Sequence, residues 1–88
     1  MKILLASLLL FATGLTSLHA STPIKPAELP APVVQTLEEY FPGAKTLSAE
    51  RETDDRRTHY EVRLQYKAIK LEVELSPEGR ILDVEMED

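Results

Sequence analysis

The sequence predicts an α+β fold, in which one N-terminal amphipathic helix packs on one face of a four-stranded antiparallel β-meander. Three observations predict this fold. Apolar residues recur every three or four positions up to Phe41, they alternate with polar residues after Gly43, and short turn-forming segments separate the alternating stretches. A chain of 88 residues has room for one such domain.

Residues 1–20 have the features of a secretory signal peptide that is cleaved after export. A positive start at Lys2 is followed by the apolar segment Ile3–Ala12 and by the small residue Ala20, the expected last residue before the cut. The alternative is a membrane anchor, but a spanning helix needs about twenty apolar residues. We therefore expect a periplasmic or secreted protein with no membrane span after cleavage.

The amphipathic helix is the first element of the domain, which we place at residues 29–88. Residues 21–28 contain two prolines and are expected to form a flexible leader. The helix opens at Leu29–Pro32, because proline is tolerated in a first helical turn, and it ends at Pro42–Gly43. Its predicted apolar face consists of Val33, Val34, Leu37, Tyr40 and Phe41.

A weakly alternating segment, residues 44–52, is the first predicted strand, with Leu47 and Ala49 on its inner face. A polar turn follows at residues 53–57. The first and last strands of a meander are sheet edges, to which a strand of a partner could add. The polar side chains of this first strand, such as Arg51 and Glu52, are typical of a protected edge.

The next two alternating segments, residues 60–66 and 69–75, predict a β-hairpin with Lys67 and Ala68 in its turn. Because the apolar residues change from even to odd positions, a two-residue turn brings both sets to one face. Arg63 and Glu72 then lie opposite each other on the outer face. The inward pairs are all apolar, namely Tyr60–Leu75, Val62–Val73, Leu64–Leu71 and Tyr66–Ile69.

The last predicted strand follows a turn at residues 76–79, where Pro77 and Gly79 supply the required backbone angles. Its inward residues should be Leu82, Val84 and Met86, opposite Leu75, Val73 and Leu71 in turn. This register places Glu74 opposite Asp83 and Glu72 opposite Glu85 on the outer face.

The charge of the chain excludes some functions and suggests one surface. The chain carries 15 acidic and 10 basic side chains and no cysteine, which argues against a nucleic-acid binder and excludes disulfides and thiolate chemistry. The open face of the sheet is either a solubilising surface or a docking surface for a basic protein. On the docking interpretation the partner-binding residues are Glu61, Glu72, Glu74, Asp83 and Glu85.

Catalytic and metal-binding patterns give little support to an enzyme. His59 is expected to be an exposed strand histidine, and no residue is placed to orient it toward Ser76. His59 and Met86 do not make a copper site of soft ligands, and the acidic residues lack the spacing of a calcium loop. We predict no catalytic residue, no metal and no cofactor.

The chain resembles small PepSY-like domains, in the group related to the β-lactamase-inhibitor-protein-like repeat. The residues that carry the resemblance are the helix end Tyr40–Ala44, the strand segment Tyr60–Leu64 and the turn and strand Ser76–Leu82. The resemblance implies an exported, non-enzymatic module that binds or inhibits peptidases or modulates an envelope protein such as a sensor. The alternative is a structural, self-associating envelope protein, and the small core favours stabilisation by a homodimer or by a partner.

Overall fold

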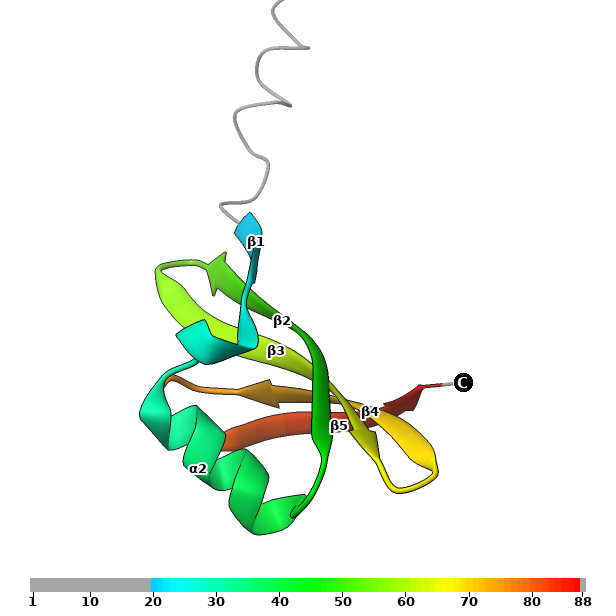
Figure 1. Ribbon diagram of the computed structural model, residues 1–88. Helices are drawn as coiled ribbons and strands as arrows, with labels where there is room; N and C mark the ends of the chain where they lie inside the picture. The colour runs from blue at the N-terminus through cyan, green and yellow to red at the C-terminus, as the bar shows by residue number, and fades with distance from the viewer. Residues whose placement is uncertain (1–19, 88) are drawn as a thin grey trace, which may run out of the picture.

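The computed structural model describes residues 20–87 and confirms the α+β class (Figure 1). An antiparallel sheet with the strand order β1-β2-β3-β4-β5 carries helix α2 on one face. The strands are β1 (Ala20–Ile24), β2 (Lys45–Asp54), β3 (Arg57–Tyr66), β4 (Ile69–Leu75) and β5 (Ile81–Glu87). The 3₁₀ helix η1 (Pro26–Glu28) and the α-helix α2 (Ala31–Tyr40) connect β1 to β2.

The prediction of four strands was wrong, because the residues assigned to a flexible leader form β1 and η1. β1 pairs with β2 from Ala20↔Thr53 to Ile24↔Ala49, so α2 follows a strand rather than opening the domain. The pairing gives β2 backbone partners on its second side, and the Ser21 hydroxyl donates a hydrogen bond to Glu50 Oε1 at 2.9 Å. β1 has little apolar alternation of its own, so its strand conformation depends on the tertiary contact. The expected signal peptide lies outside the described residues, apart from Ala20.

Helix α2 ends where the sequence predicts, although its buried face is narrower. The Phe41 N–H donates to the Leu37 carbonyl at 2.8 Å, and Gly43 then takes a positive φ of 80°. Val33 and Leu37 are buried, whereas Tyr40 is 60% exposed and does not belong to the core. At the helix end the Phe41 ring instead packs edge-to-face on Tyr66, with ring centroids 5.6 Å apart.

The predicted β3–β4 hairpin is confirmed, including all four of its inward pairs and the Lys67–Ala68 turn. The β2–β3 hairpin also has a two-residue turn, which is tighter than the polar turn predicted at residues 53–57. Its central residues, Asp55 and Arg56, have φ values of 50° and 70°. Positive values at both positions are typical of the turn type that matches the twist of a hairpin.

The β4–β5 pairing is confirmed except beside the connecting turn. Val73↔Val84, Leu71↔Met86, Glu74↔Asp83 and Glu72↔Glu85 are paired as predicted, but an irregularity beside Leu75 places Ile81 opposite it. The extra residue of this bulge is Leu82, which was expected in the core and is 45% exposed. A second irregularity between Thr46 and Ser48 leaves Leu47, also expected inward, 39% exposed.

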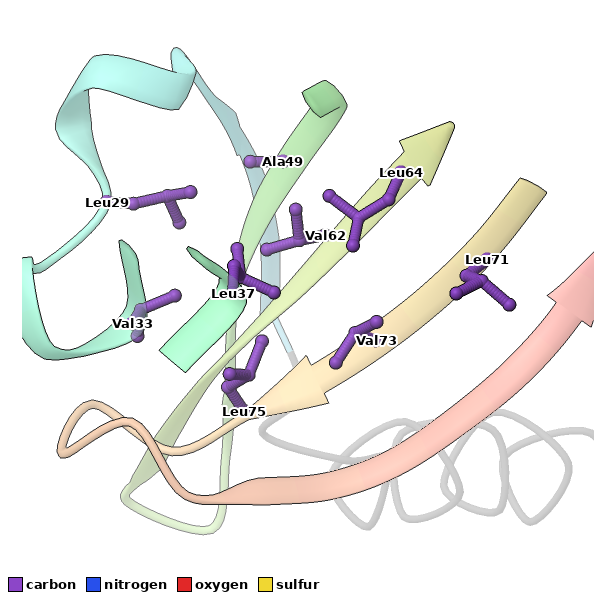
Figure 2. Packing of buried hydrophobic residues seen from close by; sticks show 9 residues of the cluster. All are labelled: Leu29, Val33, Leu37, Ala49, Val62, Leu64, Leu71, Val73 and Leu75. Atoms are coloured by element: carbon purple, nitrogen blue, oxygen red, sulfur yellow. The ribbon is translucent and has the colours of Figure 1, made fainter. Parts of the chain in front are cut away.

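The core lies between α2 and the central strands, as Figure 2 shows. It consists of Leu29, Val33, Leu37, Ala49, Val62, Leu64, Leu71, Val73 and Leu75. Ile81 of β5 is partly buried and packs against it, whereas Val84 and Met86 of the same strand are exposed. None of the helices between Ala20 and Glu87 is long and apolar enough to cross a membrane.

Candidate protein-binding surface

The sheet face opposite α2 carries a row of carboxylates that crosses four strands. Glu50 of β2 is paired with Glu61 of β3, Glu61 with Glu74 of β4, and Glu74 with Asp83 of β5. We call these four residues the acidic row. Neighbouring strands lie about 4.8 Å apart, so each carboxylate has another directly beside it.

The alternation of the strands places the acidic row on the open face. Val62, which follows Glu61 in the chain, and Val73, which precedes Glu74, are fully buried on the side of α2. Successive side chains of a strand point to opposite faces, so burying the valines turns the glutamates outward. The surface is therefore a direct consequence of the hydrophobic pattern that forms the core.

All five residues proposed from the sequence for partner binding lie on this face. Glu61, Glu74 and Asp83 belong to the acidic row, and Glu72 is paired with Glu85 in the row beside it. The sequence analysis missed Glu50 and Glu52. Their pairing partners depend on the length of the β2–β3 turn, and the predicted turn was too long. A two-residue turn at residues 55 and 56 places Glu50 opposite Glu61.

The crowding of carboxylates perturbs the residue at its centre. Partial burial and, in decreasing order of effect, the charges of Glu52, Glu72, Glu50 and Glu74 together raise the pKa of Glu61 to about 7. Burial also raises the pKa of Glu72, with the charges of Glu87 and Glu85 acting in the same direction. At neutral pH the acidic row is therefore only partly ionised at Glu61.

Basic side chains, among them His59, Arg63 and Lys70, also lie on this face. His59 is only 17% exposed, so its prediction as an exposed histidine was wrong; its Nε2 lies 2.9 Å from Glu52 Oε1 and 2.7 Å from Glu74 Oε2. Arg63 lies opposite Glu72 in the register as predicted. Its guanidinium, however, donates to both carboxylate oxygens of Glu87, at 2.8 and 3.0 Å. The pairing lowers the pKa of Glu87.

The surroundings of His59 also contain the residues most suited to hold a metal. The ligand atoms of Glu52, His59 and Glu74 lie within 4.8 Å of one another. One imidazole and two carboxylates are a donor set that Zn²⁺ accepts. In the structure the imidazole Nε2 lies within hydrogen-bond distance of both carboxylates.

The hollow beside His59 is lined by Ser76, Pro77 and Arg80 among others, and has a volume of about 620 Å³. Ser76 is buried, and its hydroxyl accepts a hydrogen bond from the Arg80 N–H at 3.1 Å. This contact holds the turn between β4 and β5. The serine thus has a structural role, and the His59 Nε2 is directed to carboxylates.

Fold and surface together define a small α+β protein whose sheet has a helix on one face and an acidic surface on the other. A scan against models of known protein families gives no match to the chain. A search of curated proteins likewise gives no significant match.

Proposed function

We propose that the chain is an exported, non-enzymatic protein-binding module that docks a basic protein through the open face of its sheet. The observation that carries the proposal is the acidic row, extended by Glu72 and Glu85. The resemblance to PepSY-like domains supports the same class of function, with a peptidase or an envelope sensor domain as the partner. Export rests on the signal-peptide features of residues 1–20.

The energetics of the acidic row favour a role in binding. Like charges directly opposite each other destabilise a sheet, and here three such contacts follow one another across β2, β3, β4 and β5. A surface that only had to be soluble could distribute its charges over both faces and alternate their sign. A basic partner would relieve the repulsion, and complementary charge would raise its association rate and favour it over neutral or acidic proteins.

Charge neutralisation of the surface tests the proposal. The variant E72Q/E74Q/D83N/E85Q removes four charges from the open face. Its matched control, E38Q/E39Q/D55N/E78Q, removes four charges from exposed positions elsewhere. Both would be expressed in an exporting cell, crosslinked in the intact envelope, and their captured proteins identified.

We expect the wild type and the control to capture the same basic protein and the open-face variant to lose it. Equal capture by all three proteins would contradict docking through this face. If the captured partner is a peptidase, stoichiometric and saturable loss of its activity identifies inhibition. Capture of the chain by itself, with a size in solution that depends on concentration, would instead favour the structural, self-associating alternative.

A further inference from the structure

The two edges of the sheet differ in their capacity to accept another strand. The β1 edge has five residues, and the fourth of them, Pro23, has no N–H to donate. The β5 edge has seven residues, contains no proline, lysine or glycine, and has β4 as its single neighbour within residues 20–87. Natural edge strands are often blocked by proline or lysine, and β5 has neither; its bulge lies near its start, at Leu82, and its charged side chains are all acidic.

The two faces of β5 also differ from each other in chemistry. On the side of α2, Val84 is 43% and Met86 is 70% exposed, although their partners on β4, Val73 and Leu71, are buried. On the open side, Asp83 and Glu85 are exposed at the end of the acidic surface. An added strand would therefore meet apolar side chains at alternate positions and carboxylates at the positions between them.

We propose that β5 binds an extended segment of a partner in which apolar and basic residues alternate, and that this segment adds to the sheet as a sixth strand. The inference deepens the proposed function, since it rests on a basic partner and names the form in which the partner is bound. The apolar residues of the segment would cover Val84 and Met86. Its basic residues would lie directly opposite Asp83 and Glu85, where each opposite-charge pair stabilises the sheet.

A second copy of β5 does not fit this edge. In an antiparallel pair of identical strands, a register that places Val84 beside apolar residues also places Asp83 and Glu85 beside carboxylates. A shift by one residue places Val84 and Met86 beside carboxylates instead. Both registers are unfavourable, whereas a basic–apolar segment satisfies both faces at once.

The probe is a labelled seven-residue peptide of alternating lysine and valine, which matches the length of β5. Its control has the same composition with the lysines and valines in separate blocks, so that the charge is equal and only the alternation differs. Affinity would be measured by fluorescence anisotropy at low ionic strength. Binding sites would be located from the exchange rates of backbone amide hydrogens.

We expect the alternating peptide to bind about tenfold more tightly than the block peptide and to slow amide exchange in β5 but not in β1. Met86→Gln should weaken it by up to about fivefold, with Leu47→Gln, also an exposed apolar position, as the unchanged control. Equal binding of both peptides would overturn strand addition and leave the proposed function in place. Binding of neither peptide would overturn both.

Discussion

Replacement of Glu61 by glutamine should stabilise the protein at neutral and higher pH but not in acid. The folded state raises the pKa of this carboxyl from 4.5 to about 7 because of partial burial and four neighbouring carboxylates. Its ionised form is therefore less favourable in the folded protein than in the unfolded chain. The wild type accordingly loses stability as the pH rises from about 4.5 to about 7, while the glutamine variant has no charge to form at this position.

The magnitude follows from the difference between the two pKa values. A shift of 2.5 units corresponds to at most about 3.4 kcal/mol, at about 1.4 kcal/mol for each unit. Glu61 is only partly buried and water screens its charge, so we expect about 1–2 kcal/mol at pH 8. For a domain of this size, that gain raises the melting temperature by roughly 5–15 °C.

Thermal unfolding followed by circular dichroism at pH 4 and pH 8 would measure the effect. Glu39→Gln, on the exposed side of α2, removes the same charge away from the sheet and is the matched control. Because burial is the largest cause of the raised pKa, most of the gain should remain in 0.5 M salt, which screens the neighbouring charges. An equal gain at both pH values, or an equal gain in the control, would refute the reasoning.

Four further variants test the packing of the turns, the helix and the core. Gly79→Ala should lower the free energy of unfolding by about 3 kcal/mol or more, because an added Cβ would lie 2.5 Å from the Pro32 carbonyl oxygen and the backbone has a φ of +89°. Gly43→Ala is the control, since Gly43 has a similar φ of +80° but open space around it, and it should lose only about 1 kcal/mol. Chemical denaturation would measure both. Thr36→Val should lose about 1 kcal/mol in the same assay, since the Thr36 hydroxyl donates to the Gly79 carbonyl at 2.6 Å; a loss near zero would show that water replaces this bond. Leu64→Ala should lose about 2–5 kcal/mol, because this side chain is 1% exposed, and a smaller loss would mean that the core collapses into the cavity.

The hairpin of β3 and β4 could be predicted in detail because local information was sufficient. Strict alternation fixed which side chains face the core, and the change of phase at Lys67–Ala68 fixed the length of the turn. The same alternation predicted that Glu74 and Asp83 would lie opposite each other, and the structure confirms this pair. For β3 and β4 the hydrophobic pattern is sufficient to determine which residues lie opposite each other.

Other parts of the fold depended on contacts that no local pattern reveals. β1 has almost no apolar alternation and becomes a strand because β2 offers it a backbone edge to pair with. The bulges beside Leu75 and after Thr46 change the phase of a strand, so Leu82 and Leu47 left the faces that alternation had assigned to them. A bulge adds one residue without a distinctive sequence signature in either strand, and here neither glycine nor proline marks the site.

The sequence by itself determined that this protein has one helix, paired antiparallel strands and an acidic outer face, because the period of apolar residues decides which side chains are buried. Only the tertiary structure decided that Glu50 completes a row of four carboxylates, and that His59 lies between Glu52 and Glu74. It also decided which sheet edge is open, since α2 covers the central strands and β1 covers β2. These features arise from the order of strands in space, where residues far apart in the chain become neighbours through backbone pairing.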